Sequence, residues 1–192
     1  MESLLVCVEM LRAAVPPESS PQPGDSAARR GSRQRALAAL QALCPLLQPA
    51  GVPLLPMQFE VLFRQLTHVL SVARAWEHSG TVEAVLSSTL RCLGALLGAC
   101  ACTKPRGALL CAPALRAVLG SLLSELLALA SPMARQSMPV RSASLAIVRT
   151  IYAIDGLDTA VAAFFVPGVA TQVPQRPRDR SLTWAAAQPC AI

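Results

Sequence analysis

Hydrophobic residues recur at three- and four-residue steps along most of this 192-residue chain, which is the spacing of amphipathic helices. Between prolines and glycines, this pattern predicts helices at 3–14, 33–45, 54–75, 82–102, 109–130 and 139–154. The four helices within 54–154 are expected to run in antiparallel succession. The residues expected to be buried there are Leu66, Leu70, Leu93, Leu97, Leu119, Leu123 and Ile151.

The helices between residues 60 and 151 form two matching pairs. "EVLFRQLTHVLSVA" (60–73) aligns with "AVLGSLLSELLALA" (117–130), and "VEAVLSSTLRCL" (82–93) aligns with "VRSASLAIVRTI" (140–151), which places Arg91 on Arg149. A pair of helices that recurs after roughly 57 residues is typical of a solenoid built from helical hairpins. The fold predicted is therefore all-α, an α-solenoid of HEAT/armadillo-like hairpins.

The pattern divides the chain into four parts. Residues 1–14 form an N-terminal helix, and 15–32 form a flexible loop rich in proline, serine and arginine. HEAT-like helical repeats occupy 33–171. Residues 172–192 are expected to be disordered, because Pro174, Pro177 and Pro189 prevent a helix through most of them.

Composition agrees with packed helices, since the chain is 53% hydrophobic but only 4% aromatic and 15% charged. The net charge of +6 is uneven: four arginines lie within 29–35 and three more within 176–180. Basic loops of this kind are more often solvated connections than nucleic-acid surfaces. A basic module that binds nucleic acid is kept as the alternative function, and salt-dependent binding to generic DNA would favour it.

Two stretches, 81–102 and 107–130, are apolar enough to raise the question of a membrane. The first contains Arg91 near its middle, and the second contains Arg116 and Glu125. A charge deep in a spanning helix costs about 2.5–3.5 kcal/mol, so helices buried within a protein explain the pattern better. The first residues lack the features of an export signal, and seven cysteines then imply reduced thiols in the cytoplasm or nucleus.

Four cysteines, Cys92, Cys100, Cys102 and Cys111, lie close together in sequence. A structural zinc site needs ligand pairs on turns, typically Cys-x₂₋₄-Cys, and Cys100-x-Cys102 is too tight for that. The expectation is that these side chains pack in the core and hold no metal.

Other chemistry has no visible basis in the sequence. The acidic residues are scattered, no serine lies in a nucleophile-elbow pattern, and "GALLGAC" lacks the ending of a phosphate loop. No enzyme activity and no cofactor are predicted. Function is expected to reside in surfaces that bind other proteins.

Several motifs resemble a known family. "LLPMQFEVLFRQL" (54–66), "VEAVLSSTLRCLGALL" (82–97), the run 110–152 and "FFVPGVAT" (164–171) are similar, in this order, to the N-terminal region of the first telomere-maintenance-two-interacting protein. That family is the HEAT-repeat scaffold of the Triple T co-chaperone complex. The resemblance implies a scaffold that matures and stabilises phosphatidylinositol-kinase-related kinases, including mTOR and the DNA-damage kinases. Implied partners are the other Triple T subunits, these kinases and the heat-shock chaperone machinery, rather than membrane or nucleic acid.

The C-terminal part departs from the family. After Thr171 the family continues with an amphipathic helix, whereas this chain ends in a divergent tail, as a truncated member would. Because each hairpin of a solenoid buries its apolar face against the next, an open apolar patch is expected there. The candidate partner-binding residues are Val161, Phe164, Phe165 and Val166.

Overall fold

The computed structural model describes residues 2–15, 26–47, 54–102 and 113–154, and these are all helical or in short connections. The six helices are α1 (Glu2–Ala14), α2 (Ser26–Leu46), α3 (Pro56–Ala75), α4 (Gly80–Cys102), α5 (Pro113–Ala130) and α6 (Met138–Ala153). Within the described ranges there is no β-strand. The predicted all-α class is therefore confirmed.

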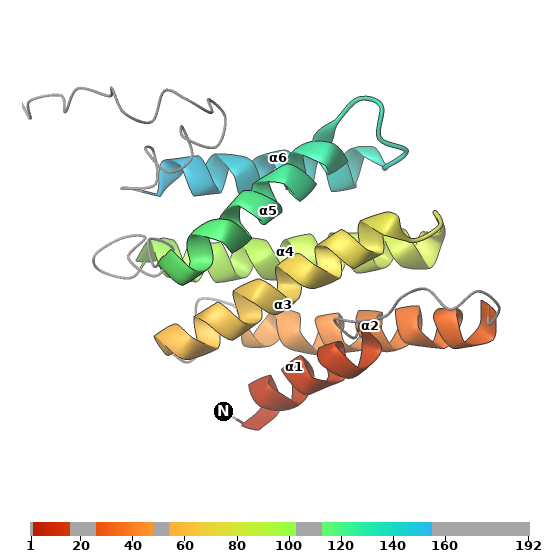
Figure 1. Cartoon of the computed structure of the whole chain (residues 1–192), viewed down its shortest axis with the longest axis horizontal. Helices are drawn as coiled ribbons and strands as arrows, with labels where there is room; N and C mark the ends of the chain where they lie inside the picture. Colours follow the sequence, from red (N-terminus) through yellow and green to blue (C-terminus); the bar gives the residue numbers. More distant parts are fainter. Residues whose placement is uncertain (1, 16–25, 48–53, 103–112, 155–192) are drawn as a thin grey trace, which may run out of the picture.

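The helices are arranged in two layers (Figure 1). Helices α1, α3 and α5 lie side by side in one layer, and α2, α4 and α6 lie side by side in the other. Successive helices run in opposite directions, so that α1 with α2, α3 with α4, and α5 with α6 form antiparallel pairs. Each pair packs against the next, and α4 lies at the centre, in contact with α2, α3 and α6.

Local sequence sets the ends of the helices. Pro56 opens α3, where its missing N–H and its fixed φ cost nothing, and the Gln58 side chain accepts a hydrogen bond from the Leu55 N–H at 3.1 Å. Pro139 plays the same part in the first turn of α6, behind the N-cap Ser137. Between α3 and α4 the turn is short, and its Ser79 hydroxyl accepts a hydrogen bond from the Val82 N–H at 3.3 Å.

All seven residues predicted to be buried are buried: Leu66, Leu70, Leu93, Leu97, Leu119, Leu123 and Ile151. The core is mostly aliphatic, and its largest rings, Phe59 and Phe63, stack with their centroids 5.7 Å apart. The hydroxyls of the buried residues Thr67, Thr89 and Ser144 are satisfied within their own helices. Thr89 donates to the Val85 carbonyl at 2.8 Å and Ser144 to the Val140 carbonyl at 2.9 Å, as mid-helix hydroxyls commonly do.

One boundary prediction was wrong. The flexible loop was expected to extend to residue 32, but α2 begins at Ser26. Residues 26–32 contain no proline, whereas 16–23 contain four, and alanine and arginine favour helix. The Ser32 hydroxyl also donates to the Ala14 carbonyl at the end of α1, which ties the first turns of α2 to its neighbour.

The end of α2 agrees with the predicted end at residue 45 to within one residue. Helix α2 continues to Leu46 with Pro45 in its last turn. Proline lacks an N–H, so the Gln41 carbonyl loses its usual helical donor. Only Leu46 follows Pro45 in the helix, so the missing hydrogen bond interrupts no later turn.

Helix α4 is long and apolar enough to cross a membrane by length and composition, over Gly80–Cys100. Its place in the structure provides another explanation. It is covered by α2, α3 and α6, and a helix covered on several sides is apolar on several sides. Arg91 is exposed on its one open side.

Candidate functional site

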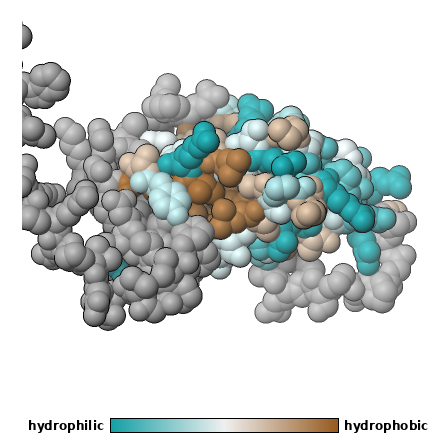
Figure 2. All heavy atoms as spheres, turned by 90° about the horizontal axis from the view of Figure 1, so that it is seen from above, coloured by the Kyte–Doolittle hydropathy of each residue, from teal (hydrophilic) through white to brown (hydrophobic). Residues whose placement is uncertain are grey.

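The predicted partner-binding residues Val161, Phe164, Phe165 and Val166 lie outside the residues that the structure describes. The end of the stack at which they were expected is formed by α5 and α6. Figure 2 looks onto this end and shows hydrophobic atoms gathered in its middle, bordered by hydrophilic side chains. Exposed apolar side chains of this pair include Leu127 on α5 and Leu145 on α6. Apolar surface is therefore open on the last described pair.

The described cysteines are grouped differently from the cluster that their spacing in the sequence suggested. Cys92 of α4 is fully buried, and its thiol donates to the Leu40 carbonyl of α2 at 3.6 Å. The thiols of Cys44 on α2 and Cys7 on α1 lie close enough to the Cys92 thiol to raise its pKa. Cys100 is buried further along α4. The grouping of Cys7, Cys44 and Cys92 could not be found from sequence spacing, because it depends on how α1, α2 and α4 pack.

Burial, together with the nearby Cys44 thiol, raises the pKa of the Cys92 thiol from 9.0 to about 12. Burial also raises the pKa of Cys7. A thiol must lose its proton to act as a nucleophile or as a metal ligand. Cys92 therefore remains protonated at neutral pH and serves as a packing residue with one weak hydrogen bond.

The raised pKa makes a prediction about alkaline stability. Between pH 9 and 12 the unfolded chain loses the Cys92 proton while the folded chain keeps it, so the free energy of unfolding falls as pH rises. The slope from this one group reaches at most about 1.4 kcal/mol per pH unit. Urea unfolding of wild type and Cys92→Ala at several pH values should show a shallower decline in the variant. Equal slopes would mean that the Cys92 pKa is not shifted.

Among the described residues, no group of three or more His, Cys, Asp or Glu side chains is placed to hold a metal ion. The side chains of Cys102, Cys111 and Cys190 are not among those described. The sequence prediction that the protein holds no zinc stays a prediction.

That prediction has a direct test. Purified protein should contain no stoichiometric zinc by mass spectrometry of the metals, and changing Cys100 and Cys102 together to alanine should alter stability by only about 1 kcal/mol. One equivalent of zinc that disappears with the double change would contradict it.

Glutamates of α1, α3 and α5 are paired with arginines. Glu9 pairs with Arg12 at 2.8 Å and Glu60 with Arg64 at 2.8 Å, each within one exposed turn of a helix. Glu125 of α5 is different, because it is half-buried and bonds Arg74 of α3, and it also accepts a hydrogen bond from Ser71 at 3.2 Å. Carboxylates held by arginine in this way join helices and are poor candidates for acid–base chemistry.

A groove of about 880 Å³ runs between α3 and α5 beside Glu125. Its lining combines polar and charged groups with a larger share of apolar surface, and it is made by Arg64, Thr67, His68, Ser71, Arg116, Ala117, Val118, Gly120, Ser121, Ser124 and Glu125. Its only imidazole is that of His68, whose Nε2 is buried without a hydrogen-bond partner among the described residues. The Ser71 hydroxyl lies beside the Glu125 carboxylate in this groove, and Arg74 holds the same carboxylate.

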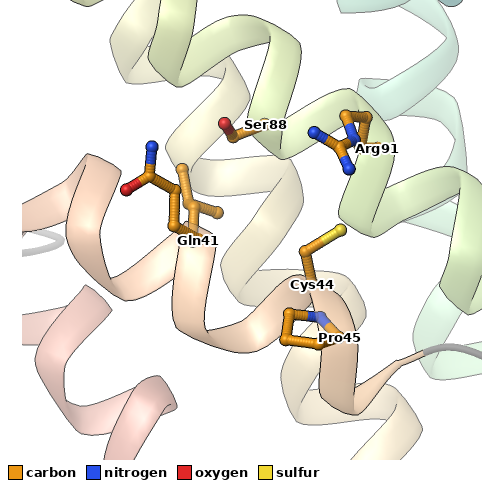
Figure 3. Close-up of a pocket in the computed structure, with 6 residues that line it drawn as sticks. Gln41, Cys44, Pro45, Ser88 and Arg91 are labelled. Carbon is orange, nitrogen blue, oxygen red and sulfur yellow. The ribbon is translucent and has the colours of Figure 1, made fainter.

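A smaller cavity of about 190 Å³ lies on the opposite layer, between α2 and α4. Figure 3 shows Gln41, Cys44 and Pro45 of α2 facing Ser88 and Arg91 of α4 across it. Leu40 completes the lining. The cavity offers one cation and several uncharged polar groups at the surface of the layer.

The four arginines that were expected in or beside the loop take part in the fold. Arg29, Arg30, Arg33 and Arg35 all lie in α2, and the Arg33 guanidinium sits 5.5 Å from the centre of the Trp76 ring. A cation over an indole face is attracted by the ring's negative potential. The sequence gave no sign of this contact, because Trp76 lies in a turn 43 positions later.

No family model, curated protein or solved structure matches this chain. The resemblance to the Triple T scaffold family therefore rests on the motifs quoted from the sequence.

Proposed function

We propose that this chain is an α-solenoid of helical hairpins that serves as a protein-binding scaffold. The observation that carries the proposal is the arrangement of the helices: three antiparallel pairs are stacked in two layers, and each pair packs on the next. Stacked pairs create long surfaces along both layers, and such surfaces are what helical-repeat proteins use to bind partners. The described residues offer grooves and charged faces but no reactive constellation, which favours binding over catalysis.

The family resemblance makes the proposal specific. The scaffold would act with the other Triple T subunits and the heat-shock chaperone machinery to mature phosphatidylinositol-kinase-related kinases, in the cytoplasm and nucleus. The quoted motifs fall on elements that the structure contains: "LLPMQFEVLFRQL" opens α3, and "VEAVLSSTLRCLGALL" forms most of α4. Several motifs of the family thus fall on consecutive packed helices, as a helical-repeat member requires.

The test is purification of the tagged chain from cells, followed by mass spectrometry of the proteins that accompany it. Recovery of both other Triple T subunits, at levels far above those with an unrelated helical-repeat protein of equal abundance, is the expected result. Recovery of chaperones alone would contradict the proposal, because chaperones also accompany poorly folded chains.

A further inference from the structure

The net charge of the described helices belongs almost entirely to one layer. Helices α2, α4 and α6 carry seven arginines and a single acidic residue, Glu83. Helices α1, α3 and α5 carry four arginines and four glutamates. Core packing does not require this unequal distribution of charge, since both layers contribute buried leucines to the same core.

The two layers also differ in how their charges are used. The ion pairs Arg12–Glu9, Arg64–Glu60 and Arg74–Glu125 all belong to α1, α3 and α5. In the other layer, Arg91 and Arg149 are exposed, and no carboxylate of the described residues pairs with either. Arg91 and Arg149 therefore present positive charge that no carboxylate among the described residues neutralises.

Three residues occupy the same position on successive helices of this layer. Gln41, Arg91 and Arg149 are exposed, and they directly follow Leu40, Leu90 and Val148, which are buried on α2, α4 and α6. We call Gln41, Arg91 and Arg149 the polar row. Packed helices lie about 8–10 Å apart, so the axes of the helices that carry neighbouring members of the row are about that far apart across the layer.

The side chains around the polar row are small or apolar, so a partner helix could pack against them. Around Arg91 the surface of α4 is made of small side chains such as Ala84, Ser88 and Ala95, and the 190 Å³ cavity lies beside it (Figure 3). On α6, Leu145 and Tyr152 flank Arg149 and are each 44% exposed. The row thus combines donors for carboxylates with apolar contact area.

We propose that the polar row docks an acidic amphipathic helix of a partner protein, which lies across α2, α4 and α6 with carboxylates seven residues apart. Seven residues of helix span about 10.5 Å and return to the same face, which matches the spacing between packed helices. Arginine's planar fork suits a carboxylate, and the Gln41 amide supplies a third donor. This inference names the partner chemistry of the proposed scaffold and rests on that proposed function.

Two other partners fit the row less well. In an extended strand, same-face residues are separated by about 6.6 or 13 Å, and neither distance matches the roughly 8–10 Å between the axes of packed helices. Duplex DNA presents a charge every 1.7 Å or so and is bound by many cations at once, whereas Arg91 and Arg149 stand apart among small and apolar side chains. The exposed Leu145 and Tyr152 would gain nothing from phosphates.

The test measures binding of a fluorescent helical peptide to the full chain by anisotropy. The probe is an alanine-rich peptide of about three heptads with glutamates seven residues apart and leucines beside them. Its isomer has the same composition with the glutamates on different faces. We expect the isomer to bind about tenfold more weakly or worse, and binding of the probe to weaken as salt rises. Equal binding of the two peptides would overturn the proposal.

Substitutions of arginines on each layer then test whether the peptide binds at the polar row. Arg91→Glu with Arg149→Glu should weaken the probe about tenfold or more, because two attractive charges become repulsive. Arg12→Glu with Arg116→Glu makes the same change in net charge on the other layer and should alter binding less than about twofold. Both variants should keep wild-type helical content by circular dichroism. As a milder second variant, Arg91→Gln with Arg149→Gln should weaken the probe without adding repulsion. Equal effects on the two layers would overturn the proposal.

A short DNA duplex in the same assay separates this inference from nucleic-acid binding. The duplex should compete with the probe only at much higher concentration, and stronger binding of the duplex would overturn the proposal. Failure of the scaffold function would appear separately, as loss of both Triple T subunits from the tagged wild-type chain. If those subunits are recovered while probe and isomer bind alike, the docking inference alone has failed.

Discussion

Leu93→Ala is expected to lower the free energy of unfolding by about 3–5 kcal/mol, among the largest effects available to a single substitution in this chain. Leu93 is fully buried on α4, the helix that contacts α2, α3 and α6. Truncation there removes contacts to several helices, and packed neighbours cannot all close the cavity. Urea unfolding followed by circular dichroism measures the change.

Leu145→Ala on α6 is the matched control, since it makes the same chemical change at a side chain that is 44% exposed. It should lower the free energy of unfolding by less than about 1 kcal/mol. If both substitutions cost the same, α4 is not the centre of the core.

The second large effect is a loss of amide protection that is confined to the helices near the substituted residue. Leu11→Ala, in α1 at one end of the stack, should reduce amide protection about a hundredfold in α1 and α2 and leave α5 and α6 nearly unchanged. In stacked repeats each unit is stabilised mainly by its neighbours, and α1 contacts only α2 and α3 to any extent. Leu93→Ala should reduce protection from α2 to α6. Hydrogen exchange with mass spectrometry resolves these segments.

A uniform loss of protection along the whole chain after Leu11→Ala would contradict this expectation. It would mean that the six described helices unfold as one cooperative unit, so that the stack does not behave as linked hairpins.

The fold was predictable where the apolar pattern is long and regular. In α3 the three- and four-residue steps of leucine and phenylalanine predict one buried face, in α4 the apolar steps extend over several sides, and the expected residues of both helices are buried. The start of α2 was not predictable in the same way. Its first turns contain arginines, serine and glycine, and they are held by contacts to Ala14 and Trp76 that only the folded chain brings together.

The surfaces were less predictable than the core. Spacing in the sequence grouped Cys92 with Cys100, whereas packing places Cys92 beside Cys44. The alignment of Arg91 with Arg149 could be read from the repeat in the sequence, but the position of the two side chains in the fold could not. That both lie on the open side of one layer, away from the glutamates, depends on how the pairs stack.

The central claim, that this chain is a scaffold of the Triple T type, is tested most directly by co-expression with the other two Triple T subunits. The mixture is separated by size exclusion, and the mass of each peak is measured by light scattering. The account predicts a stoichiometric complex that contains this chain and disrupts when the core is opened by Leu93→Ala. Elution of the folded wild-type chain apart from both subunits would contradict it.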